Sequence, residues 1–286
     1  MSATSVQTET PKNTINRVST NELSVKNNLR MGYLFTSLII IFTAIAAVAG
    51  IFFSDEIYLS AEAGHSFIAN DVVTLFIGLP ILLISMWLTH RDKLIGLLFW
   101  PGAIFYGLYN YTIYLFSAPL TIMYPLYLLI VTLSLYTTIF LVASIQGEPV
   151  KEKLTGYVSE RLSSAPLIFF GFIFGLRAIG LMASAAIEQE PLPDPELGLL
   201  VADFIACAAW LIGGILLWRH QALGYVTGTG LLFSTSMLFI GVIAVLLLQP
   251  IISGGSLLVM DVIVLAIMGL LCFVPFVLYV RGVVKS

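Results

Sequence analysis

The 286-residue sequence contains little charge: only 10% of its residues are Asp, Glu, Lys or Arg, whereas 59% are hydrophobic. Its mean hydropathy is +1.00. Such a chain lacks the polar side chains needed to cover a water-exposed surface, so lipid must be its main solvent. A soluble globular protein is therefore excluded. The net charge of −3, with no cluster of basic residues, also argues against a nucleic-acid partner.

Residues that carry enzyme and cofactor chemistry are equally scarce. There are three histidines, none in the middle of an apolar run, which argues against a haem held between helices by paired histidines. No apolar run contains a lysine, which excludes a retinal Schiff base, and no HExxH, GxSxG or Walker A motif occurs. Cys207 and Cys272 lie inside apolar runs and are interpreted as small hydrophobic residues. We predict neither a cofactor nor a metal site.

Eight apolar runs are each long enough to cross a membrane as a helix, which needs roughly 20 residues. They cover residues 31–53, 67–89, 95–117, 122–145, 165–187, 197–218, 222–248 and 257–280. Residues 1–30 are rich in Ser, Thr, Asn and charge, so we expect a disordered tail with no cleaved signal peptide. The sequence predicts an all-α integral membrane protein, a bundle of eight transmembrane helices.

The distribution of basic residues predicts the orientation of this bundle. If the N-terminal tail is cytoplasmic, twelve of the thirteen Lys and Arg residues fall on the cytoplasmic side. The Asp, Glu, Lys and Arg residues of the outer loops are then all acidic: Asp55, Glu56, Glu62, Glu188, Glu190, Asp194 and Glu196. We predict that both termini are cytoplasmic and that the protein is a multi-pass protein of an inner or plasma membrane.

The second half of the chain resembles the first at a few positions. Asp71, Trp87, Gly96 and Gly102 recur in the same order, with a gap, as Asp203, Trp218, Gly224 and Gly230. These matches indicate a parallel 4+4 internal repeat, an arrangement found in some transporters. Glycine and tryptophan are common in membrane helices, so a chance resemblance is the alternative.

Four ionisable residues inside the apolar runs are the main candidate functional residues, because such groups are costly in lipid. Arg177 lies near the centre of its run, roughly 15 Å from the outer end at the helical rise of 1.5 Å per residue. Asp71, Asp203 and Asp261 lie roughly 6–9 Å inside the outer ends of theirs. A pair between Arg177 and one of these acids would remove the cost of leaving either charge alone. The alternative for each acid is a structural role near a helix N-terminus.

Polar residues at helical spacing accompany these charges. Asn70 and Thr74 flank Asp71, Asn110 lies on the third run and Tyr127 on the fourth, so the stripes indicate an interior cavity that binds a substrate or ion. Tyr106, Tyr109, Tyr111 and Tyr114 face all sides of the third helix, so we expect at least half of them to meet lipid or headgroups.

Three function classes follow. The first is a secondary transporter or channel-like protein for a small solute or ion, with a buried Arg/Asp site in the outer half of the bundle. The second is a structural or accessory subunit of a membrane complex, or a homo-oligomer, whose buried charges fix helix packing. The third is a membrane enzyme acting on a lipid or a quinone, although no catalytic motif supports it. The lipid bilayer is the one partner common to all three.

Overall fold

The computed structural model describes residues 25–26, 28–58, 61–117, 121–189, 192, 194–254 and 256–286. This part of the chain is almost entirely helical and contains no strand; an isolated bridge joins Val25 to Ile145. Its elements are α1 (Arg30–Phe52), α2 (Ser54–Ile57), α3 (Ala61–Val73), the π-helix η1 (Thr74–Gly78), α4 (Leu79–His90), α5 (Leu94–Ser117), α6 (Tyr124–Ser144), α7 (Gly147–Leu154), α8 (Glu160–Glu188), α9 (Asp194–Trp218), α10 (Ala222–Ser253) and α11 (Val259–Lys285).

Seven helical segments in the described chain are long and apolar enough to cross a membrane. They are Arg30–Phe52, Gly64–His90, Tyr124–Ser144, Glu160–Glu188, Glu196–Trp218, Ala222–Ile252 and Val259–Lys285. The sequence-based prediction of a helical, multi-pass membrane protein is therefore confirmed. The remaining long helix, α5, has 24 residues and is not among these seven; it carries tyrosines, an asparagine and Pro101 in its interior.

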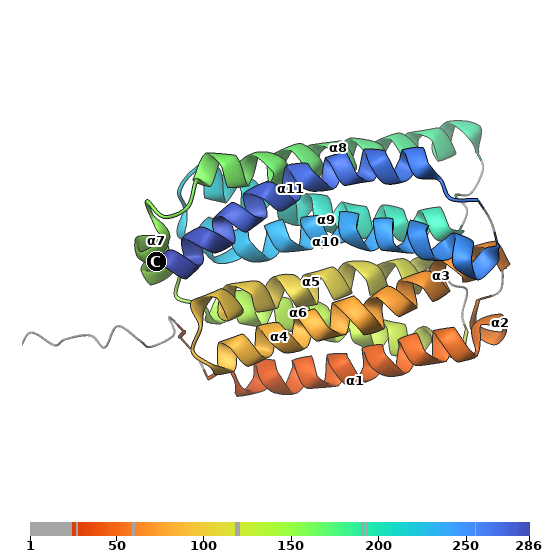
Figure 1. Ribbon diagram of the computed structural model, residues 1–286, viewed down its shortest axis with the longest axis horizontal. Coiled ribbons are helices and arrows are strands. Elements are labelled where there is room, and N and C mark those ends of the chain that lie inside the picture. The colour runs from red at the N-terminus through yellow and green to blue at the C-terminus, as the bar shows by residue number, and fades with distance from the viewer. Residues whose placement is uncertain are drawn as a thin grey trace, which may run out of the picture.

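The long helices run side by side in two groups (Figure 1). One group contains α1, α5, α6 and the continuous helical segment made of α3, η1 and α4. The other group contains α8, α9, α10 and α11. The groups meet where α5 packs against α9 and α10. At the α5–α10 crossing, a Cβ atom added to Gly102 would lie 2.3 Å from the Gly230 Cα, so only glycine permits this approach.

The α4–α5 and α9–α10 turns have the same backbone hydrogen bonds at a constant offset in residue number. The amide of Lys93 donates to the Leu88 carbonyl, as that of Gln221 does to Leu216, and Gly96 and Gly224 donate to Lys93 and Gln221. Asp92 and His220 occupy corresponding positions, and both have a left-handed backbone, with φ of 57° and 53°. The two helical hairpins are thus equivalent residue by residue around the turn.

This equivalence corrects the sequence alignment of the two halves. The offset that pairs Gly96 with Gly224 and Gly102 with Gly230 also pairs Trp87 with Ile215 and Asp71 with Leu199. The residue pattern had instead matched Trp87 to Trp218 and Asp71 to Asp203. Two tryptophans near helix ends were mistaken for a corresponding pair because such positions favour tryptophan in membrane proteins generally.

Several helix boundaries differ from the predicted spans. The fifth and eighth helices extend beyond the predicted 165–187 and 257–280, because α8 and α11 continue into polar segments at Glu160–Ser164 and Arg281–Lys285. The predicted tail lies outside the described residues up to position 24, but Lys26 donates a backbone hydrogen bond to the Ser144 carbonyl at 2.7 Å. The end of that segment is therefore held against the end of α6.

Candidate functional site: two buried acids beside a tyrosine-lined cavity

Asp71 on α3 is 2% exposed and is bound by two tyrosines. Tyr58 donates a hydrogen bond to Oδ2 at 2.5 Å, and Tyr114 on α5 lies 2.9 Å from Oδ1. A Cβ atom on Gly50 would lie 2.1 Å from Oδ2, so α1 can pack against the carboxyl only because residue 50 lacks a side chain. Among the described residues, no Lys, Arg or His forms an ion pair with Asp71.

Tyr58 lies in the connection between α1 and α3, where burial and then the Asp71 charge raise the pKa of its hydroxyl. Tyr58 therefore stays a hydrogen-bond donor to Asp71. Tyr114 is more versatile, because its hydroxyl lies 3.1 Å from the Phe67 carbonyl oxygen as well as 2.9 Å from Asp71. It also accepts a hydrogen bond from the Asn70 amide at 3.0 Å.

Asp203 on α9 is the second buried acid, with a fully buried side chain. Tyr109 on α5 donates to its Oδ1 at 2.7 Å, and the Arg177 guanidinium on α8 binds Oδ2 in a salt bridge. The Arg177 side chain remains 42% exposed, because α8 lies at the edge of the bundle and packs mainly on α9. Unlike Asp71, Asp203 thus has its charge compensated by a base.

A cavity of about 180 Å³ lies between these two acids, in the half of the bundle away from the α4–α5 turn. It is lined by residues of α3, α5, α9 and α10, so it lies at the junction of the two helix groups. Tyr109 and Tyr114, the tyrosines that bind Asp203 and Asp71, both line it. Its other polar lining groups are Ser66, Asn70, Tyr106 and Asn110.

A second, smaller cavity of about 30 Å³ lies across α5 from the first. It is bounded by α1, the π-helix η1 with the start of α4, and α5, and its polar lining residues include Thr74 and Asn110. Tyr106 and Asn110 line both cavities. This space can hold one water molecule with polar partners, and the π-helix beside it is the kind of helical irregularity often found at functional sites.

The structure brings together most of the residues selected from the sequence. Asn70, Thr74 and Asn110 line the two cavities, and Asp71 is hydrogen-bonded to Tyr114, which lines the larger one. Tyr127 is 1% exposed and lies in tilted ring contact with Tyr111 and Tyr114 at centroid distances of 6.0 and 5.4 Å, but it has no hydrogen-bond partner in the described part of the chain.

Two of the predicted residues lie elsewhere. Arg177 does not line the cavity but reaches Asp203 from outside, and Gly180 and Ser184, which share its helix face, are exposed. Asp261 lies exposed in the first turn of α11, with no ion pair to a described residue. This position matches the structural alternative considered for it, an acid near a helix N-terminus.

The tyrosines are the main correction at the site. Tyr106, Tyr109, Tyr111 and Tyr114 are 5%, 8%, 1% and 2% exposed, so the expectation that half of them face lipid is wrong. α5 is surrounded by α4, α6, α9 and α10, and every face of it contacts protein. The signal available in the sequence was the number of hydrogen-bonding side chains on this run, four tyrosines and Asn110, which is a reason to place it at the centre of the bundle.

In the described residues, no group of three or more His, Cys, Asp and Glu could hold a metal ion. Comparisons with family models, curated proteins and solved structures find no match to this chain. What the site does must therefore be argued from its own geometry.

Proposed function

We propose that the protein is a proton-coupled secondary transporter that binds a small, uncharged polar solute in the cavity between Asp71 and Asp203. The observation that carries this proposal is the cavity wall: Tyr109 and Tyr114 each contact the solute space and a buried acid at the same time. A solute that displaces either hydroxyl therefore changes the hydrogen bonding of a carboxyl group.

Asp71 is the acid suited to carry the proton. As a carboxylate it accepts from Tyr58 and Tyr114. When Oδ1 is protonated, it can donate to the Tyr114 hydroxyl, which in turn donates to the Phe67 carbonyl 3.1 Å away. The network thus satisfies both protonation states with the same heavy atoms, and intramembrane acids of this kind are typical of proton relays.

The charges around the cavity favour an uncharged solute. An anion would lie beside the tyrosines that bind two carboxyl groups, and Arg177 is already bound to one of these acids, Asp203. The lining of the cavity is mostly apolar, and the hydroxyl and amide groups of Ser66, Asn70, Tyr106 and Asn110 add a few donors and acceptors for the polar groups of a neutral molecule.

The proposed transporter has eight membrane-spanning helices, namely the seven candidate spans and α5, with both termini in the cytoplasm. The 24 residues of α5 reach about 36 Å at 1.5 Å per residue, enough for a hydrocarbon core of about 30 Å. α1 begins and α11 ends at the same end of the bundle (Figure 1), as an even number of spans requires.

The two helix groups are, in this proposal, a duplicated unit related by a pseudo-twofold axis near Gly102 and Gly230. The matching turns and the glycine pair at the crossing of α5 and α10 support it. Substrate sites of repeat-built transporters lie at the junction of the repeats, where this cavity lies.

The test is solute uptake into proteoliposomes with an imposed proton gradient, using a panel of small neutral polar solutes. Asp71→Asn should lower gradient-driven accumulation of the solute about tenfold or more, because an amide cannot carry the proton. Solute exchange measured in the absence of a gradient should be unchanged. Asp55→Asn, an exposed acid on α2, is the control and should behave as the wild type. If Asp71→Asn accumulates solute as well as the wild type does, the proposed coupling is wrong.

The salt bridge between Arg177 and Asp203 favours a second candidate, an accessory subunit whose buried charges serve packing. That candidate predicts no solute flux from the purified protein and stable co-purification with one membrane partner.

A further inference from the structure

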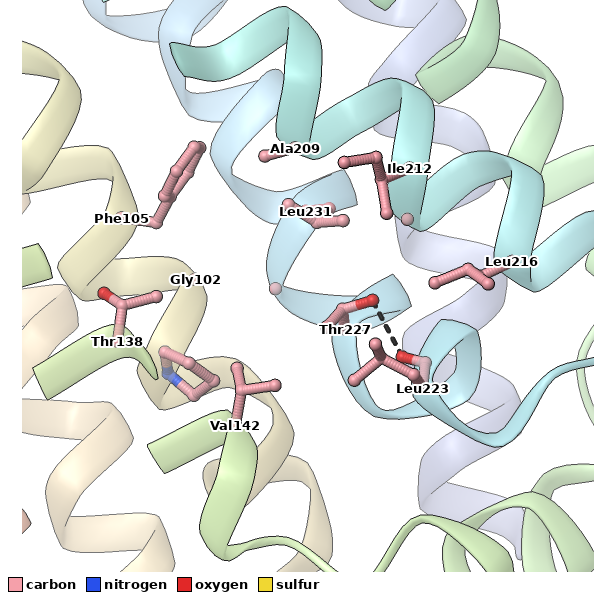
Figure 2. Close-up of a pocket in the computed structure, with 13 residues that line it drawn as sticks. Gly102, Phe105, Thr138, Val142, Ala209, Ile212, Leu216, Leu223, Thr227 and Leu231 are labelled. Carbon is pink, nitrogen blue, oxygen red and sulfur yellow. Dashed lines mark hydrogen bonds between the residues drawn. The ribbon is translucent and has the colours of Figure 1, made fainter. Parts of the chain in front are cut away.

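A lipid-facing crevice with a volume of about 210 Å³ lies in the opposite half of the bundle from the tyrosine-lined cavity. Figure 2 shows Phe105 of α5 with Thr138 and Val142 of α6 on one side, and Ile212 and Leu216 of α9 on the other. α5 and α10 form its floor, and α6 and α9 make no extensive contact with each other across it.

The lining of this crevice is almost entirely apolar. Thr227 donates its hydroxyl hydrogen bond back to the Leu223 carbonyl at 2.9 Å, and the Thr138 hydroxyl has no partner in the described chain (Figure 2). A stable water needs two to four polar partners, and apolar cavities of about 150 Å³ stay dry and bind hydrocarbon. Ile212 and Leu223 at its edge are 59% and 46% exposed, so the crevice is accessible from the membrane.

A corresponding gap on the other side of the α5–α10 crossing is filled. There Phe99 of α5 packs against Phe233 of α10 at a centroid distance of 4.1 Å and against Phe276 of α11 at 5.8 Å. The residue offset that relates the two turns pairs Phe99 with Thr227 and Phe233 with Phe105. The gap on one side of the α5–α10 crossing is thus filled by the ring of Phe99, whereas the gap on the other side, at Thr227, is left open. Helix packing alone therefore does not require the crevice to be open.

The turn at the end of the crevice supplies a basic residue. Leu216 and Leu223, which line the crevice, flank the α9–α10 turn, where Arg219 and Gln221 are exposed. Exposed donors at that level suit the phosphate of a lipid whose chain enters the membrane beside them.

We propose that this crevice is a binding site for an acyl chain of an anionic membrane phospholipid, with its phosphate held near Arg219. The chain takes the place that Phe99 fills in the other half of the molecule. This site is separate from the tyrosine-lined cavity, and the inference does not rest on the proposed transport.

The experiment uses the full-length protein in mixed micelles with phosphatidylglycerol that carries a diazirine on its acyl chain. After illumination, labelled residues are mapped by peptide mass spectrometry. We expect labelling at crevice residues at least tenfold above that at Ile179 and Leu270, which are 59% and 57% exposed on α8 and α11 and report general contact with lipid. Labelling no higher in the crevice than at these two positions would overturn the proposal.

Thr227→Phe reproduces the filled arrangement and should lower crevice labelling about tenfold. Thr227→Val, which keeps the volume but removes the hydroxyl, should label as the wild type does. Melting curves check that both variants are folded. If Thr227→Phe does not fold, Val142→Phe is used in its place, because it fills the crevice from α6. Unchanged labelling in a folded, filled variant would refute the site.

Competition and headgroup changes identify the occupant. Excess unlabelled phosphatidylglycerol should abolish crevice labelling; if only an isoprenoid quinone competes, the occupant is an isoprenoid and the acyl-chain assignment is wrong. The same probe with a phosphatidylcholine headgroup should label at least threefold less, and Arg219→Gln should remove that difference. Equal labelling by both probes in the wild type would contradict the role of Arg219.

Discussion

Replacing Arg177 with methionine tests how the buried charges stabilise the fold. The change leaves the Asp203 side chain, fully buried, without its counter-ion. Removing one partner of a buried ion pair costs about 3–5 kcal/mol. Because Arg177 is 42% exposed and Tyr109 still donates to Asp203 at 2.7 Å, we expect the lower end, about 3 kcal/mol. That corresponds to a fall in melting temperature of roughly 6 °C or more.

The double variant separates a lost charge pair from lost packing. In Arg177→Met with Asp203→Asn, the amide oxygen still accepts from Tyr109 and no charge is left buried, so most of the stability should return. Asp203→Asn alone should cost less than Arg177→Met, since the long arginine side chain can extend toward the membrane surface. Arg219→Met, at an exposed turn position, should stay within about 0.5 kcal/mol of the wild type.

These values are measured as melting temperatures and denaturation midpoints in one detergent, with helicity as a check on folding. If Arg177→Met melts with the wild type, or if the double variant melts no higher than Arg177→Met, the ion pair does not contribute as argued. In an assay of function, Arg177→Met should abolish activity and Arg177→Lys should retain part of it.

Two further predictions concern packing and orientation. Gly102→Ala should destabilise the protein by about 1–3 kcal/mol in thermal melts, because the new Cβ would lie 2.3 Å from the Gly230 Cα. Gly107→Ala on the same helix is its control: no atom lies within 4 Å of the new Cβ, so stability should stay equal or rise. A reporter enzyme fused after Ser286 should be active in the cytoplasm, and activity on the outer side would contradict the eight-span topology.

Much of the architecture could be predicted because membrane helices are recognised in a sequence by the length and apolar composition of their runs. α5 ends at Ser117, the last residue of the predicted span 95–117, and a proline follows shortly in the sequence. The π-helix at Thr74–Gly78 could not be foreseen, since it inserts one extra residue without interrupting the apolar pattern.

The pairing of the buried charges was beyond the sequence. Arg177 was expected to meet one of three acids, and only the packing of α8 on α9 decides that it meets Asp203. The partners of Asp71 were missed because Tyr58 lies in a connecting segment and Tyr114 looked like an interfacial residue. A tyrosine in a membrane helix has the same local pattern whether it anchors at the surface or serves a buried acid.

The two acids differ in a way that suits movement of one helix group against the other. Tyr58, Asp71 and Tyr114 all belong to the group that contains α1 and α5, so that network can move as a unit. The Arg177 salt bridge ties α8 to α9 within the second group, whereas Tyr109 donates to Asp203 across the junction.

In the proposed transporter, the hydrogen bond from Tyr109 to Asp203 must therefore lengthen whenever the two groups separate around the solute. The glycine contact of Gly102 with Gly230 can act as the pivot, because it has no side chains to interlock. Arg177 holds the charge of Asp203 in either state, so releasing Tyr109 does not leave a bare carboxylate in the membrane. Asp203 needs Arg177 because its hydrogen bond from Tyr109 crosses the junction between the two helix groups. Asp71 needs no base, because Tyr58 and Tyr114 move together with it.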